Sequence, residues 1–188
     1  YLNEDMGPNT IFFFFYLKET RNQNVIVKIL GKKHRRHLII DHRTLEQVHK
    51  EFYFLDLLKF TNIVPTLVEY HSSANLNFIS MEKFGDEWLD GLDFILRRRD
   101  KQLSKTFIRN IIKGLMEMNY RSIFYTDIKP DNLLVNQKTG EIRFIDFEDA
   151  IYSWCKNPES YEAVGTIGYM ASEVLAMKPF YVKPSQVF

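Results

Sequence analysis

Residues 125–132 and Asp146 concentrate acidic and amide side chains in a short part of the chain. Asp127, Asp131 and Asn132 lie in the sequence Tyr-Thr-Asp-Ile-Lys-Pro-Asp-Asn, and with Asp146 they span about 20 residues. Apolar runs flank residues 125–132 on both sides and lead into Asp146, as in short strands that end at polar loops. Hard divalent cations bind oxygen ligands that are held on rigid supports. The pattern therefore indicates a site for a metal-bound phosphate.

This stretch resembles two motifs of the protein kinases. The family pattern is His-Arg-Asp-x-Lys-Pro-x-Asn, then a strand pair, then Asp-Phe-Gly, and this chain keeps Asp127, Lys129, Asn132 and Asp146. The resemblance implies that Asp127 orients the attacking hydroxyl and that Lys129 steadies the γ-phosphate of ATP. Asn132 and Asp146 would bind Mg²⁺. The lysine two residues after the aspartate resembles the pattern of the serine/threonine kinases rather than that of the tyrosine kinases.

Three positions depart from the family pattern: Tyr125, Thr126 and Glu148 replace a histidine, an arginine and a glycine. In the family, this arginine binds a phosphate on the activation loop. Because Thr126 replaces it, a phosphate is not expected to order the loop in this way. An active enzyme would then be constitutive or controlled by a partner protein. Tyr125 is an aromatic that can share the supporting role of the histidine. Glu148 either binds a cation directly or strains a segment where glycine has permissive dihedrals.

Strands near the N-terminus must position a further lysine. Residues 11–16 and 25–30 are rich in β-formers and flank a polar turn at 19–24. Lys28 lies in the second run, where burying an unpaired ammonium is costly. An edge-strand lysine that reaches water is one interpretation. The other is that Val-Ile-Val-Lys resembles the kinase Val-Ala-Ile-Lys, whose lysine holds the α- and β-phosphates of ATP.

The glycine-rich loop of kinases has a partial counterpart in Met-Gly-Pro-Asn-Thr-Ile, residues 6–11. Gly7 is the candidate for phosphate binding through its backbone. Pro8 lacks the N–H group that such a loop would donate. A plain turn before a strand explains the same residues.

A helix is predicted at residues 44–60. Apolar residues recur there at steps of three and four, at Leu45, Val48, Phe52, Leu55 and Leu58. Glu51 lies beside this stripe and precedes Asn-Ile-Val at a spacing similar to that of the helix-C glutamate of kinases. The resemblance implies that Glu51 pairs with Lys28, and an ordinary surface glutamate is the alternative.

Two further strands are predicted at residues 66–70 and 77–81, followed by Met-Glu-Lys-Phe-Gly-Asp. This sequence resembles the kinase hinge, with Met81 at the gatekeeper position. The backbone groups of Glu82 and Phe84 would then bond the adenine of ATP.

Helices are predicted at residues 89–99 and 104–121. The second has a broad apolar face of the kind found on a helix packed under a sheet, made of Phe107, Ile108, Ile111, Ile112, Leu115 and Met118. Further on, residues 165–173 resemble Gly-Thr-x-x-Tyr-x-Ala-Pro-Glu, which ends the kinase activation segment. Thr166 corresponds to the threonine that contacts the catalytic aspartate and lysine.

The composition favours a packed intracellular protein. Hydrophobic residues make up 45% and charged residues 26%, and the formal net charge is +1. No overall field attracts nucleic acid or a membrane surface. The single cysteine, Cys155, cannot form an internal disulfide, which favours a cytoplasmic or nuclear location. The longest apolar run, residues 11–17, is far shorter than the roughly 20 residues of a membrane helix.

We therefore expect an α+β, bilobal fold of the protein kinase kind. The domain covers residues 1–188, with a β-rich N-lobe at 1–81, a hinge at 82–86 and a mainly helical partial C-lobe at 87–188. Gln186 lies where the family starts its central large-lobe helix with an aspartate. Because a kinase domain has about 250 residues, at the upper end of single domains, we expect the C-lobe to be truncated.

The predicted function is that of a serine/threonine protein kinase, which transfers the γ-phosphate of Mg-ATP to protein hydroxyls. Its hinge and metal motifs are similar to the calcium/calmodulin-dependent and PIM-like branch. The alternative is a pseudokinase scaffold, favoured by the glycine-poor loop, Glu148, Gln186 and the short C-lobe. A small-molecule kinase fits residues 165–173 less well. The expected partners are a protein substrate and a regulatory protein, with neither nucleic acid nor membrane.

Overall fold

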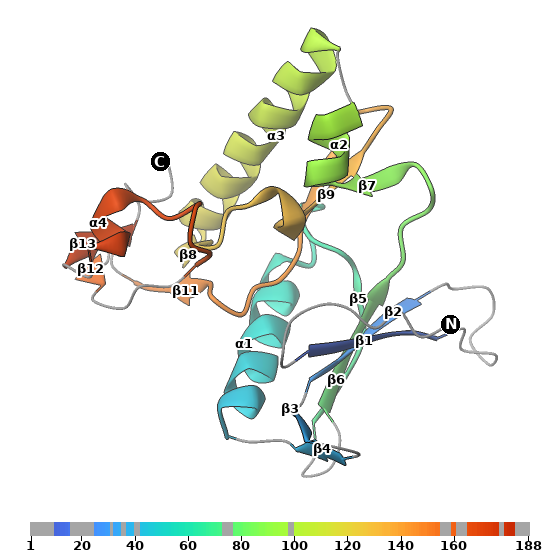
Figure 1. Ribbon diagram of the computed structural model, residues 1–188, viewed down its shortest axis with the longest axis vertical. Coiled ribbons are helices and arrows are strands. Elements are labelled where there is room, and N and C mark those ends of the chain that lie inside the picture. The colour runs from blue at the N-terminus through green and yellow to red at the C-terminus, as the bar shows by residue number, and fades with distance from the viewer. Residues whose placement is uncertain are drawn as a thin grey trace. The chain divides into compact units, whose positions relative to one another are not determined.

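The computed structural model describes residues 10–15, 25–30, 32–34, 37–39, 42–72, 77–97, 100–154, 159–160, 165–176 and 179–182. The chain forms two compact units, Tyr1–Gly85 and Asp86–Phe188 (Figure 1). The proposed hinge at residues 82–86 includes the boundary between them. Its role as a hinge remains a prediction.

The first unit is built on a four-stranded antiparallel sheet in the order β1-β2-β6-β5. The strands are β1 (Thr10–Phe15), β2 (Val25–Leu30), β5 (Leu67–Ser72) and β6 (Asn77–Glu82). β3 (Lys32–His34) and β4 (His37–Ile39) form a separate antiparallel pair. β1 and β2 consist mainly of aromatic and β-branched residues, which favour strands.

Lys28 lies on an interior strand of this sheet. In the register it faces Phe12 on β1 and Ile79 on β6, and the residue is only 2% exposed. The interpretation of Lys28 as an edge-strand lysine that reaches water is therefore wrong. The side chain is covered on its face of the sheet, so its ammonium does not reach water as a snorkelling lysine would.

Helix α1 (His42–Leu58) packs against β2, β5 and β6. It begins and ends two residues before the predicted range. Phe54, Leu55 and Leu58 supply its buried face. The helix ends where the N–H and Oγ1 of Thr61 both donate to the Leu58 carbonyl. Asn62 lies four residues beyond the helix with φ 54, a left-handed conformation that asparagine tolerates.

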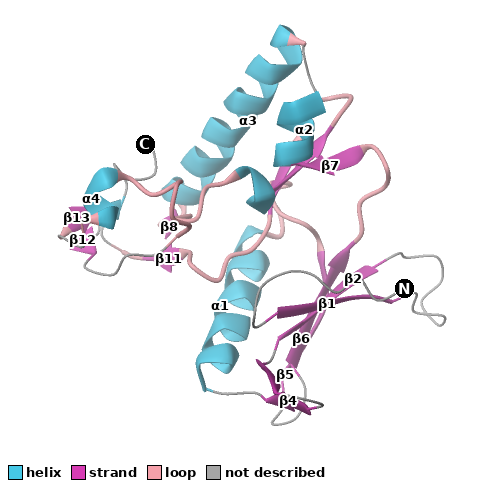
Figure 2. Cartoon of the chain, viewed as in Figure 1, coloured by secondary structure: helices cyan, strands magenta, loops and turns pink. Residues whose placement is uncertain are grey.

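The second unit combines helices with short strand pairs (Figure 2). Its helices are α2 (Gly91–Arg97), α3 (Lys101–Tyr120), the 3₁₀ turn η1 (Pro130–Asn132) and α4 (Ser172–Leu175). A three-stranded sheet contains β7 (Trp88–Asp90), β9 (Leu133–Asn136) and β10 (Ile142–Phe144). Two further pairs are β8 (Ile123–Phe124) with β11 (Ile151–Tyr152), and β12 (Glu159–Ser160) with β13 (Phe180–Tyr181).

The predicted start of the helix at residues 89–99 was wrong. Leu89 and Asp90 belong to β7, where Leu89 pairs with Val135 of β9. The helix begins only at Gly91, after Asp90, whose Oδ1 accepts from the Asp93 N–H at 2.8 Å. A capping aspartate at this position marks the end of the strand and the start of the helix.

Helix α3 begins at an Asp100 cap and ends close to its predicted limit. Its predicted apolar face is only partly covered. Phe107 and Met118 are buried, whereas Ile108 and Ile112 are 55% and 53% exposed. None of the described helices combines the length and apolar character that a membrane span requires.

The contact between α3 and β10 depends on a glycine. An added Cβ at Gly114 would lie 2.3 Å from Cε2 of Phe144, and Phe144 is fully buried. Gly114 is itself buried on the helix. The missing side chain therefore lets the aromatic ring of β10 reach the helix backbone.

Replacing Gly114 by alanine should lower the free energy of unfolding by up to about 2 kcal/mol. Overpacking costs about 1–3 kcal/mol, and alanine recovers about 1 kcal/mol of helix propensity. Gly85→Ala is the matched control, because an added Cβ there meets nothing within 4 Å. Urea denaturation should separate the two variants. Equal stabilities would show that Phe144 can move aside.

Candidate functional site

The first unit contains a buried ion pair. Nζ of Lys28 lies 2.7 Å from Oε2 of Glu51, and the two side chains are only 3% and 2% exposed. Strand β2 supplies the lysine and helix α1 supplies the glutamate. This is the pairing that the resemblance implied, and the interpretation of Glu51 as an ordinary surface residue is wrong. Because burying two charges is expensive, the pair is a candidate for function as well as structure.

The predicted hinge begins where β6 ends. Met81 is buried, as expected for a residue between sheet and core. The N–H of Glu82 donates to the Thr66 carbonyl at 2.9 Å, and its Oε1 accepts from the Thr66 N–H at 2.9 Å. These bonds fix the end of the strand. The binding of adenine by the Glu82 and Phe84 backbone remains a prediction, and Gly7 and Gln186 lie outside the described residues.

The second unit gathers the predicted catalytic residues around the Asp127 carboxylate. Its Oδ1 accepts from Oγ1 of Thr166 at 2.7 Å. Its Oδ2 accepts from Nδ2 of Asn132 at 2.8 Å and lies 2.8 Å from Nζ of Lys129. The lysine also donates to Oγ1 of Thr166 at 2.7 Å. Both contacts implied for Thr166 by the resemblance are present.

The electrostatics of this cluster favour a charged lysine. Burial of Lys129 opposes its charged form, but the hydrogen bond to Asp127 and the attraction of nearby carboxylates outweigh this. Together they raise the pKa of Lys129 above its ordinary value. Besides Asp127, the contributing carboxylates are Asp146 and Asp131. The ammonium is therefore available as a fixed positive charge at neutral pH.

Two glycines allow the cluster to form. Gly165 has φ +120, and an added Cβ would lie 3.3 Å from the Thr126 carbonyl oxygen. At Gly91 an added Cβ would lie 2.5 Å from the Pro130 carbonyl oxygen. Gly165 belongs to a motif that the sequence shows. Gly91 was missed, because a single glycine before a helical pattern gives no sign of which backbone it approaches.

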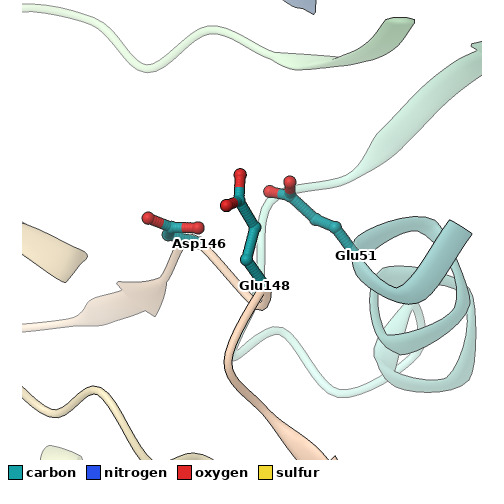
Figure 3. Close-up of side chains that lie close together, drawn as sticks. All are labelled: Glu51, Asp146 and Glu148. Carbon is teal, nitrogen blue, oxygen red and sulfur yellow. The ribbon is translucent and has the colours of Figure 1, made fainter. Parts of the chain in front are cut away.

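The Asp146 turn, residues 145–149, follows β10. Asp146 has φ 63, one of three positive values among the described non-glycine residues, with Asn62 and Ser122. The expectation that Glu148 strains the segment by taking up a glycine conformation is contradicted, because the left-handed residue is Asp146 and not Glu148. Carboxylate oxygens of Asp146 and Glu148 lie within 4.8 Å of each other. Figure 3 shows both side chains extending from this turn, and Glu51 on α1.

Tyr125 occupies the position of the family's histidine and supports the turn. Its side chain is buried, and its hydroxyl donates to the Ile145 carbonyl. Its ring contacts Phe144 and Phe147 edge-on, with centroids 5.2 and 5.1 Å away. The expectation that an aromatic can share the supporting role is confirmed.

Asn132 and Asp146 fit the chemistry of a magnesium site. The amide nitrogen of Asn132 donates to the carbonyl and to Oδ2 of Asp127. Its amide oxygen is therefore the end that can accept a cation. Together with the Asp146 carboxylate it offers hard oxygen ligands, which Mg²⁺ prefers.

Comparison with known proteins identifies the class. A model of the protein kinase domain matches residues 14–188, so the chain belongs to the protein kinase family. The predicted α+β kinase fold is confirmed. Serine/threonine-protein kinase PknA of Nostoc sp. is 30% identical over 173 residues, and the match covers 85% of this chain and 29% of that protein.

Plant and yeast kinases are also similar to this chain. CBL-interacting protein kinase 33 of Oryza sativa subsp. japonica is 24% identical over 177 residues, 93% of this chain and 38% of that protein. MAP kinase kinase kinase wis4 of Schizosaccharomyces pombe is 31% identical over 143 residues, 70% of this chain and 10% of that protein. The chain thus spans well under half the length of these relatives.

Removing the ammonium of Lys28 should destabilise the first unit strongly. Lys28→Met leaves the Glu51 charge buried, which costs about 3–5 kcal/mol in the free energy of unfolding. Lys59→Met is the matched control, because its pair with Asp56 is exposed and is worth about 0.5 kcal/mol. Urea denaturation measures both. A loss for Lys28→Met no larger than the control would show that the buried pair contributes little.

Alkaline unfolding should report the raised pKa of Lys129. Because this pKa is higher in the folded state, the stability from the charged form is complete below the unfolded-state pKa. It is then lost as pH rises through the folded-state pKa. The stability difference between wild type and Lys129→Met, from urea titrations, should stay constant up to about pH 10 and shrink above it. A difference that already shrinks between about pH 7 and 9 would contradict the raised pKa.

Proposed function

We propose that this chain transfers the γ-phosphoryl group of Mg-ATP to serine or threonine hydroxyls of proteins. The observation that supports the proposal most is the closed network of Asp127, Lys129, Asn132 and Thr166. Phosphoryl transfer depends mainly on positioning and on neutralising charge. A network with each partner held by hydrogen bonds meets that need.

Asp127 would orient the attacking hydroxyl and accept its proton. Its carboxylate already accepts a hydroxyl donor, the Oγ1 of Thr166, at 2.7 Å. Lys129 would lie beside the transferred group and stabilise the charge that develops on its oxygens. Its raised pKa keeps it protonated in that role.

Nucleotide binding would draw on both units. In the first, Lys28 would bind the α- and β-phosphates, while Glu51 holds its ammonium in place. The backbone of Glu82 and Phe84 would bond the adenine edge, and Gly7 would contribute a phosphate-binding N–H group. In the second, Asn132 and Asp146 would hold Mg²⁺, which neutralises phosphate charge when bound.

A protein is the proposed substrate, because residues 165–173 match the kinase segment that receives peptides. A regulatory protein is a second proposed partner. Several similar plant kinases are named for interaction with CBL proteins, and the family's phosphate-binding arginine is replaced by Thr126. The finer likeness to the calcium/calmodulin-dependent and PIM-like branch is part of the same proposal.

The pseudokinase alternative is supported by a specific observation. Glu148 places a second carboxylate within 4.8 Å of Asp146, where the family pattern has glycine. Added negative charge beside a metal ligand changes how a nucleotide and its metal bind. A protein of this kind would bind nucleotide and transfer little or no phosphate.

Radioactive transfer from labelled ATP to a basic peptide tests the proposal. With Mg²⁺ present, wild-type protein should phosphorylate serine or threonine, and Asp127→Asn should reduce the rate at least about 100-fold. Asp56→Asn, on the exposed surface of α1, is the matched control and should retain the rate.

Equal background transfer by wild type and Asp127→Asn would reject the kinase activity. ATP-dependent thermal stabilisation without transfer would then favour the pseudokinase, because a ligand that binds the folded state raises its stability.

A further inference from the structure

Two neighbouring hydroxyls of residues 125–132 bond the two ends of the Asp146 turn. The Tyr125 hydroxyl donates to the carbonyl of Ile145, the first residue of the turn. Oγ1 of Thr126 donates to the carbonyl of Asp149, the last residue, at 2.6 Å. We propose that Tyr125 and Thr126 are positioning residues that hold the Asp146 carboxylate in place without any phosphate on the activation segment. The inference rests on the proposed kinase function.

The Tyr125 hydroxyl bond is held in place because the side chain is buried among other aromatic rings. The residue is 1% exposed, and its ring makes edge contacts with Phe144 of β10 and with Phe147 of the turn. A buried hydroxyl without a partner is unfavourable, so the phenol favours the conformation in which Ile145 accepts its bond. The side chain thereby connects the hydrophobic core to the residue before Asp146.

The Thr126 bond fixes the other end. Beyond it, Phe124 of β8 pairs with Ile151 of β11, and the Ala150 N–H donates to the Phe147 carbonyl at 3.1 Å. Thr126 is β-branched, so few rotamers are open to its hydroxyl. The turn is thus bordered by a strand pair on one side and by β10 on the other.

A turn of this shape needs such support. Asp146 has φ 63, a conformation that persists in a non-glycine residue when the surrounding structure holds it. The N–H of Ile145 donates to the Asn132 carbonyl at 3.0 Å. Ile145 is therefore bonded through both its N–H and its carbonyl, directly before Asp146. Ile145 therefore connects the two candidate metal ligands: its N–H bonds the Asn132 carbonyl, and Asp146 is the next residue in the chain.

Neither hydroxyl bond involves a charged group. The family's arginine at this position acts by binding a phosphate, whereas the Thr126 side chain binds a backbone carbonyl of the same segment. The order of the Asp146 turn then depends on the folded chain alone. We therefore expect activity that persists after treatment with a phosphatase.

Amide hydrogen exchange in the complete chain tests the arrangement directly. Thr126→Val and Tyr125→Phe each remove one hydroxyl and keep the shape of the side chain. Each should speed exchange at the Ile145 and Ala150 amides about threefold to tenfold, the effect of one hydrogen bond. Thr126→Ser should restore wild-type exchange. Thr106→Val removes a hydroxyl bonded to the Gln102 carbonyl in α3 and should leave these amides unchanged.

Metal dependence provides the second measurement. Thr126→Val should raise the Mg²⁺ concentration for half-maximal transfer several-fold and leave the KM for peptide unchanged, since only the Asp146 side is loosened. Phosphatase-treated wild type should keep both its rate and its amide exchange. Wild-type exchange in Thr126→Val, or faster exchange after phosphatase treatment, would overturn the inference. If wild type transfers no phosphate, the proposed function fails, whereas the exchange data still test the two hydroxyl bonds.

Discussion

The buried carboxylate of Asp127 is the constraint on which the second unit depends. It is 8% exposed, and a buried charge is unfavourable unless its neighbours compensate. Lys129 and Asn132 do so from the same loop, and Thr166 does so from a segment far along the chain. Satisfying one carboxylate therefore fixes the loop and residues 165–173 in a single arrangement. Gly165 makes this possible, because a side chain there would crowd the loop backbone.

Much of the site could be predicted from the sequence, because its residues lie at the short spacings of the kinase motifs that the chain resembles. The strand pattern around Lys28 and the helical stripe beside Glu51 placed the two residues, and the resemblance to the kinase motifs implied that they pair. The end of helix α3 was predicted to within one residue from its apolar period, whereas its start lies three residues earlier than predicted, directly after the Asp100 cap. These features depend on residues near one another in the chain.

What the sequence did not reveal depends on pairing between distant residues. Leu89 was predicted as helical, and it forms a strand because Val135 of β9 is its partner. Ile108 and Ile112 were predicted on a covered face, yet periodicity alone does not say what packs there. Likewise, no spacing rule links Thr126 to the Asp149 carbonyl, because the two meet only through the pairing of β8 with β11.

The three departures from the kinase pattern act on one turn. Asp146 and Glu148 place two carboxylates within 4.8 Å of each other, and like charges at this distance favour conformations that separate them. The hydroxyls of Tyr125 and Thr126 oppose such movement, because they bond the carbonyls at both ends of the turn. A glycine at position 148 would bring no second charge and would need less restraint. The neutral bonds and the added carboxylate therefore lie in one turn, and the contacts that hold its two ends require no phosphate.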